Sequence, residues 1–142
     1  MKYITAILVT LPFSALSATH CFYNLSNVDV CKQAAKMANE IKSDLPLNVS
    51  KDVSLYAVEV KDNKLIAYVR LNYSEYDALK IYPWAKKSWG FFKNQWRDTV
   101  TAFACGDENS LKSFVRMGGE LQYIYSFING DPYDSFSIVY CK

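Results

Sequence analysis

Four cysteines, at positions 21, 31, 105 and 141, constrain this chain more than any other feature of its sequence. An even number of cysteines favours disulfide bonds in an oxidising compartment, and four cysteines allow three pairings. We expect the local solution, in which Cys21 pairs with Cys31 and Cys105 pairs with Cys141. By chain entropy, closing the ~36-residue loop contributes about 3–4 kcal/mol, and closing the ~10-residue loop about 2–3 kcal/mol.

A zinc site is the competing interpretation of the cysteines. None of them follows the C-x2-C spacing of structural zinc sites, and the single histidine, His20, lies close to the N-terminal export signal described next. We therefore predict no metal site, and nothing in the sequence indicates another cofactor.

Residues 1–18 have the features of a secretory signal peptide. Lys2 supplies the positive start, ITAILVTL the apolar core, and Ala15, Ser17 and Ala18 the small residues of a cleavage site. The apolar run is far shorter than the ~20 residues that span a bilayer. We expect cleavage, no membrane-spanning segment afterwards, and a single domain over 19–142.

A lipid anchor at Cys21 is the alternative to a free exported domain. Lipid attachment in bacteria needs a small residue directly before the cysteine, and His20 occupies that position. The sequence therefore predicts a periplasmic or secreted protein without a lipid.

The periodicity of the chain predicts an α+β fold with the order α-β-β-α-α-β-β. A first amphipathic helix is capped by Ser26 or Asn27 and stopped by Pro46. Apolar alternation and polar turns predict two hairpins, over 55–71 and 121–141. Further helices are expected over 74–81, from Trp84 to about Phe103, and, capped by Asp107, up to Gly118-Gly119. We expect a four-stranded antiparallel sheet with helices packed on one face.

The helix that begins near Trp84 is the strongest candidate for a functional element. Four of its aromatic residues recur at helical spacing and are expected to pack on the sheet: Trp89, Phe92, Trp96 and Phe103. Other aromatic residues lie outside that stripe among lysines, which is typical of interaction surfaces. We expect a groove between helix and sheet that takes an amphipathic helix of a partner, with four contacts: Tyr82, Trp84, Lys87 and Phe91.

The residues argue against an enzyme. A lone histidine leaves no Ser-His or Cys-His pair, and disulfide formation removes the thiol nucleophiles. Six carboxylates are explained as caps, turn residues or solvated side chains: Asp98, Asp107, Glu108, Glu120, Asp131 and Asp134. A net charge of +2 and the export signal also argue against a nucleic-acid partner.

Two segments resemble a widespread group of small exported bacterial proteins. The first contains an Ala-rich helix and an L-P-x-x-V-type segment, here carried by Leu45, Pro46, Val49, Ser50, Val53, Ser54 and Leu55. The second contains two cysteines, a glycine after a short helix, a Tyr-rich strand and a glycine turn, here carried by Cys105, Gly118 or Gly119, Tyr123, Tyr125, Gly130 and Cys141.

The same layout, over about residues 27–141, is similar to the Vibrio-type pilotins of type II secretion. The resemblance implies a small α/β protein that binds the C-terminal tail of an outer-membrane secretin. His20 departs from the pattern, because pilotins are lipoproteins.

The resulting expectation is a non-enzymatic protein-binding module, pilotin-like or an envelope adaptor, whose partner is another envelope or secreted protein. The alternative is a secreted inhibitor or immunity-type protein that blocks an enzyme through the loop from Asn129 to Tyr133.

Overall fold

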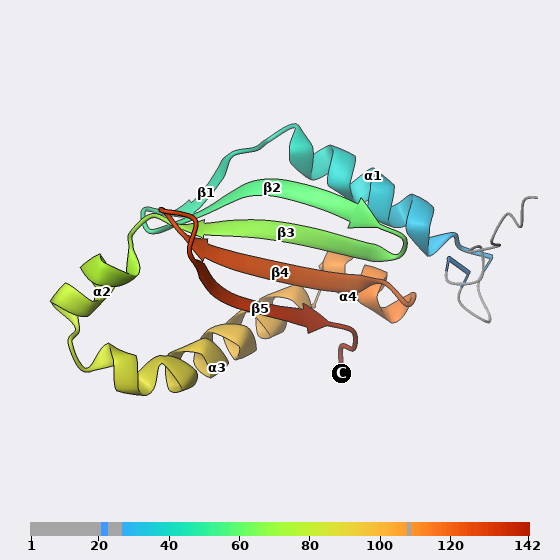
Figure 1. Cartoon of the computed structure of the whole chain (residues 1–142). Coiled ribbons are helices and arrows are strands. Elements are labelled where there is room, and N and C mark those ends of the chain that lie inside the picture. The colour runs from blue at the N-terminus through green and yellow to red at the C-terminus, as the bar shows by residue number, and fades with distance from the viewer. Residues whose placement is uncertain (1–20, 23–26, 108) are drawn as a thin grey trace, which may run out of the picture.

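The structure is a computed structural model that describes residues 21–22, 27–107 and 109–142. The expected signal peptide, His20 and Glu108 lie outside the described residues. Figure 1 shows helices and strands in the following order: α1 (Val30–Lys42), β1 (Leu47–Ser50), β2 (Val53–Lys61), β3 (Lys64–Leu71), α2 (Glu75–Ile81), α3 (Ala85–Ala104), α4 (Ser110–Arg116), β4 (Glu120–Phe127) and β5 (Pro132–Ile138).

The five strands form one mixed sheet in the order β1-β2-β3-β4-β5. The α+β class and both predicted hairpins are present, but the predicted four-stranded antiparallel sheet is wrong in two respects. A short strand, β1, is added at one edge, and the central pair β3–β4 is parallel. A long connection containing α2, α3 and α4 separates β3 from β4. All three helices are expected by their ranges, but the predicted order α-β-β-α-α-β-β counts only two of them. Such a crossover connection is what parallel neighbours require.

One face of the sheet carries the buried side chains. Residues that lie opposite one another share a face, and the pairs Leu65–Leu121 and Leu71–Phe127 are buried. The alternate residues of β3, such as Ile66 and Tyr68, point to the other face and are half-buried. Buried residues of α1, of α4 and of the last turn of α3 pack on this face and form the core. The prediction that helices pack on one face of the sheet agrees with this arrangement.

Both disulfides are the local pairings that the sequence favours. Cys105 is bonded to Cys141, with a Cα–Cα distance of 5.3 Å, and this bond ties the end of α3 to the C-terminus. Cys21 is bonded to Cys31 at 5.1 Å and holds the N-terminal segment against the first turn of α1.

The residue that caps a helix differs from the prediction in two places. Asp29 caps α1 in place of Ser26 or Asn27, because its carboxylate accepts from the backbone N of Lys32 at 3.0 Å. Asn109 caps α4 in place of Asp107, which instead forms an ion pair with Lys112 at 2.8 Å. The C-terminal prediction is confirmed, since Gly118 follows α4 with a φ of +92°.

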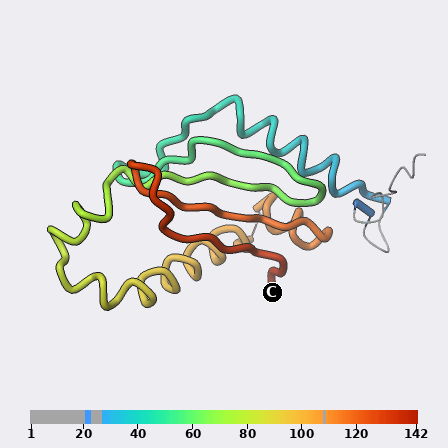
Figure 2. The backbone as a smooth tube through the Cα atoms, viewed as in Figure 1, coloured from blue at the N-terminus to red at the C-terminus, as the bar shows by residue number. Residues whose placement is uncertain are grey.

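The helices α2 and α3 form an arm that leaves the sheet and returns to it. α2 and the start of α3 lie beyond the end of the strands, and α3 then runs back below β5 (Figures 1 and 2). Ser74 begins α2 with a capping box, in which its side chain and that of Asp77 satisfy each other's backbone N–H groups. No helix of the described residues has both the length and the apolarity to cross a bilayer.

Candidate functional site

An open cleft of about 800 Å³ separates the α2–α3 arm from the sheet. Its floor is formed by Val53 and Leu71, at the ends of β2 and β3, and one wall by Tyr133 of β5. The opposite wall comes from the arm and is largely apolar: Ala78, Ile81, Tyr82, Trp84, Ala85, Trp89, Phe92 and Trp96. The groove that the sequence predicts between this helix and the sheet therefore has a physical counterpart.

The position of α3 is fixed by aromatic contacts with β4 and β5. The Trp89 ring meets Tyr133 edge-on at a centroid distance of 5.7 Å, and the Trp96 ring meets Tyr125 edge-on at 6.0 Å. Edge-to-face pairs at these distances stabilise by about 0.5–1.5 kcal/mol beyond burial. Two of the four predicted core aromatics thus contact the sheet, but both remain only half-buried because the cleft opens beside them.

The Tyr125 ring that Trp96 contacts belongs to a stack of three rings on β4 and β5. Tyr123 and Tyr125 of β4 are stacked with Phe136 of β5 at centroid distances of 5.4 and 6.1 Å. Burial raises the pKa of Tyr123 and of Tyr125 to about 12, and burial likewise raises that of Tyr133 to about 12. These phenols stay protonated at neutral pH and serve as packing groups.

The ion pair between Arg97 and Asp134 is the main polar link between α3 and β5. The guanidinium binds both carboxylate oxygens, with Nε donating to Oδ2 at 2.9 Å. The hydrogen bonds to Asp134 raise the pKa of Arg97. This bidentate geometry fixes the angle of the helix as well as its distance from the strand.

Phe103 is the clear error among the predicted core residues. Its side chain is 70% exposed, whereas the next residue, Ala104, is fully buried. Near its C-terminus α3 packs through the smaller residue, so the aromatic side chain points into solvent.

The four residues predicted to contact a partner fall into two groups. Tyr82 and Trp84 line the cleft, and their rings touch edge-on at 5.7 Å. Lys87 and Phe91 are exposed and lie outside the lining. The sequence did not identify Val53, Leu71 and Tyr73 as cleft residues, because they belong to the sheet and its end and join the cleft only in the folded chain.

The cleft contains few groups suited to catalysis. Its charged lining residues are Lys51, Asp52 and Asp77, and no histidine or cysteine is among them in the described part of the chain. Hydrogen bonds from the Ser74 side chain and backbone lower the pKa of Asp77, which is occupied as a helix-capping residue. Burial, with the charge of Asp52, raises the pKa of Tyr73.

The carboxylates considered as catalytic pairs have structural roles wherever the structure describes a contact. Glu120 binds Lys64 at 2.9 Å and accepts from Ser137 at 2.6 Å. Asp131 lies in the β4–β5 turn, where its side chain accepts from Asn129 at 2.8 Å. Asp98 is exposed on α3. The alternative function, inhibition of a partner enzyme through the loop from Asn129 to Tyr133, stays a prediction.

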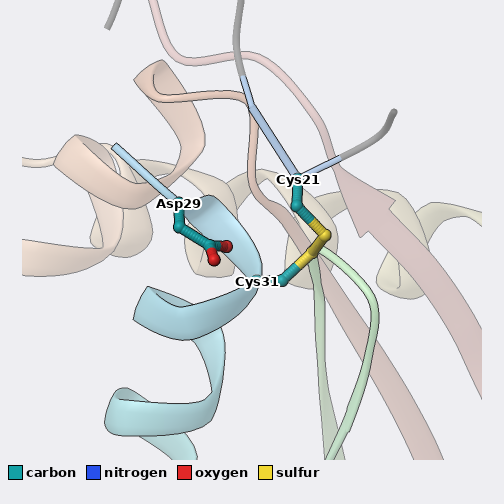
Figure 3. A group of neighbouring side chains, drawn as sticks. All are labelled: Cys21, Asp29 and Cys31. Atoms are coloured by element: carbon teal, nitrogen blue, oxygen red, sulfur yellow. A yellow bond between two sulfur atoms is a disulfide. The ribbon is translucent and has the colours of Figure 1, made fainter. Parts of the chain in front are cut away.

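One group of potential metal ligands occurs in the described residues, at the start of α1. Figure 3 shows Asp29 beside the sulfur atoms of Cys21 and Cys31, all within 4.8 Å of one another. Both sulfurs belong to the disulfide and the carboxylate caps the helix, so each group already has a structural role.

Together the fold and the cleft define a small, disulfide-bonded α+β domain with an open cleft lined by aromatic side chains beside a helical arm. No protein-family model and no curated protein sequence matches the chain. Solved structures do match it. A Pseudomonas aeruginosa protein described as secreted gives a TM-score of 0.59 at 16% identity, covering 77% of this chain and 88% of that chain.

Two type 2 secretion system pilotins share the same fold. EpsS of Vibrio vulnificus gives a TM-score of 0.60 at 14% identity, covering 77% of this chain and 86% of its own. AspS of Vibrio cholerae gives a TM-score of 0.55 at 13% identity, covering 77% and 87%. At these identities the likeness shows the fold, and the structural neighbours of the chain are the Vibrio-type pilotins that its sequence resembles.

Proposed function

We propose that this protein is an exported, non-enzymatic binding module whose cleft takes an apolar segment of another envelope protein. The observation that carries the proposal is the lining of the cleft, where aromatic side chains of the arm face Val53 and Leu71 across open space. Two disulfides are typical of an oxidising compartment, which supports the location.

The shape of the cleft favours a protein segment over a small molecule. A small-molecule site usually encloses its ligand and buries roughly 70–90% of the ligand's surface. Here Ile81, Tyr82 and Trp84 form the wall and are themselves more than half exposed. A helix that lays one apolar face into the cleft would cover these side chains and leave its polar face in solvent.

The pilotin fold suggests which partner to test first. The resemblance makes the C-terminal segment of a secretin the leading candidate, with the cleft as its docking site. The contacts we propose within the cleft are Tyr82 and Trp84, which the sequence also predicts, together with Trp89 and Phe92.

Site-specific photo-crosslinking in the periplasm tests this proposal. A photoreactive phenylalanine analogue replaces Tyr82 at the rim of the cleft, or Phe103 or Tyr140 as matched exposed aromatics elsewhere. We expect one envelope protein to be crosslinked from position 82 and not from the two control positions. Crosslinks of equal yield from all three positions would contradict the cleft as the docking site.

A cleft-filling variant provides the second arm of the experiment. Ala78 is a half-buried lining residue of α2, and Ala78→Trp places a large side chain in the cleft without removing a core contact. We expect this variant to keep its unfolding midpoint and to lose the crosslink from position 82. An undiminished crosslink in the folded variant would place the partner outside the cleft.

A further inference from the structure

The outer side of the α2–α3 arm exposes apolar side chains that the cleft does not use. Tyr76 is 74% exposed and Phe91 is 67% exposed, and neither lines the cleft. Trp84, which forms the rim of the cleft, is 56% exposed. The arm projects beyond the end of the sheet (Figure 1).

The exposed rings form a connected cluster. Trp84 contacts Tyr82 and Phe92 at centroid distances of 5.7 Å, and Phe92 contacts Phe91 at 5.9 Å. Trp84, Lys87 and Phe91 follow the helical spacing of three and four residues and lie on one side of α3. We call Tyr82, Trp84, Lys87 and Phe91 the arm tip.

The middle of the arm, residues 78–97, has charged side chains of one sign, whereas Glu75, Asp77 and Asp98 lie outside this stretch. Residues 78–97 include four lysines and one arginine and no aspartate or glutamate, although the whole chain has a net charge of only +2. Arg97 is paired with Asp134, and the Lys93 ammonium lies over the Tyr133 ring at 5.2 Å. Among the described residues, Lys80, Lys86 and Lys87 are exposed and have no ion-pair partner.

We propose that the arm tip binds the surface of an anionic phospholipid bilayer. Exposed Trp, Tyr and Phe side chains on a helix with lysines beside them are the combination that settles at the headgroup level, where the rings enter the interface and the lysines contact lipid phosphate. The excess of positive charge on the arm complements a phosphatidylglycerol surface.

A bilayer fits this surface better than a second protein does. Lys87 and Phe91 of the arm tip lie outside the lining of the cleft, and a lipid surface requires no matching shape. The cleft faces the other way, with Trp89 and Trp96 against the sheet. Tyr82 and Trp84 belong to the cleft as well as to the arm tip, so variants at Lys87 and Phe91, which lie outside the cleft, test membrane contact separately.

Co-sedimentation of the purified, oxidised protein with protein-free vesicles tests the proposal. One set of vesicles contains phosphatidylethanolamine and phosphatidylglycerol, and the other contains phosphatidylcholine alone. We expect binding to the anionic vesicles that falls by about tenfold or more at high salt, and much weaker binding to the neutral ones. Absence of binding, or equal binding to both sets, would overturn the proposal.

Variants assign the binding to the arm tip. We expect Phe91→Ser with Lys87→Glu to lower vesicle binding by about tenfold or more, since one apolar anchor is lost and one charge is reversed. The matched control is Phe103→Ser with Lys42→Glu, which changes an exposed aromatic of the same helix and an exposed lysine of α1. An equal loss in both double variants would overturn the assignment.

Tryptophan fluorescence gives an independent readout. Trp84 is exposed whereas the other two tryptophans are half-buried, so transfer of the arm tip into the interface shifts mainly the Trp84 emission to shorter wavelength. We expect this blue shift with anionic vesicles, and its loss in Trp84→Phe at a vesicle concentration that binds the variant as fully as the wild type. An undiminished blue shift in Trp84→Phe would overturn the proposed contact.

Discussion

Asp134 and Arg97 form an ion pair in which the two partners differ greatly in their access to water. The Asp134 side chain is 5% exposed, whereas the Arg97 side chain is 40% exposed. Removing the arginine therefore leaves a buried carboxylate without a cation, but removing the carboxylate leaves a guanidinium that water still reaches.

The difference predicts unequal costs for the two single variants. We expect Arg97→Ala to lower the free energy of unfolding by about 2–3 kcal/mol and Asp134→Ala by about 1 kcal/mol. Urea unfolding of both variants measures these costs. Equal costs, or a greater cost for Asp134→Ala, would show that solvent access does not control this pair.

Gly119 and Gly90 form a matched pair of glycines for testing core packing. A Cβ atom at position 119 would lie 2.5 Å from the Phe114 ring, which is fully buried, whereas a Cβ at position 90 meets nothing within 4 Å. We expect Gly119→Ala to destabilise by about 2–3 kcal/mol through overpacking. We expect Gly90→Ala, inside α3, to stabilise by about 0.5–1 kcal/mol. Thermal unfolding checks both signs, and a neutral Gly119→Ala would contradict the tight contact.

The two disulfides should contribute unequally to stability. The Cys105–Cys141 bond closes a loop with a sequence separation of 36, against 10 for Cys21–Cys31. Replacing both members of the first pair with serine should cost about 3–4 kcal/mol, and of the second about 2–3 kcal/mol. Unfolding in urea under non-reducing conditions compares them. The reverse order would mean that loop entropy does not decide the difference.

The buried tyrosines predict a loss of stability at high pH. The pKa values of Tyr123 and Tyr125 are raised from 10.0 to about 12, because burial disfavours the phenolate. Because the pKa is raised in the folded state, each protonated phenol contributes to the stability of the fold. This contribution to stability is complete below pH 10.0 and is lost as the pH rises towards about 12. Phenolate absorbance and circular dichroism should change together in this range. Tyr123→Phe should shift the transition to higher pH, and an unchanged midpoint would contradict the role of this phenol.

Much of the local structure was predictable because it depends on neighbouring residues. The capping box at Ser74, the left-handed glycine after α4 and the alternation in β3 each follow from a few adjacent side chains. The face of β3 that enters the core follows in the same way, since period-two alternation assigns Leu65, Val69 and Leu71 to one side.

The parallel pairing of β3 with β4 was decided by tertiary structure. The pattern of each hairpin is the same whether its neighbour runs parallel or antiparallel, and only the path of three helices between them sets the direction. β1 left no signal, because all four of its residues are exposed and show no alternation between buried and exposed positions.

The sequence showed which aromatic side chains share one side of α3, but it did not show how deeply each of them is buried. Spacing placed Trp89, Trp96 and Phe103 on the same stripe, yet the first two contact strands beside an open cleft and the third is exposed. Helical spacing determines which side chains lie together on one side of a helix. How closely each part of that side approaches the sheet depends on the path of the whole arm, which the Arg97–Asp134 pair and the rings of β4 and β5 hold in place.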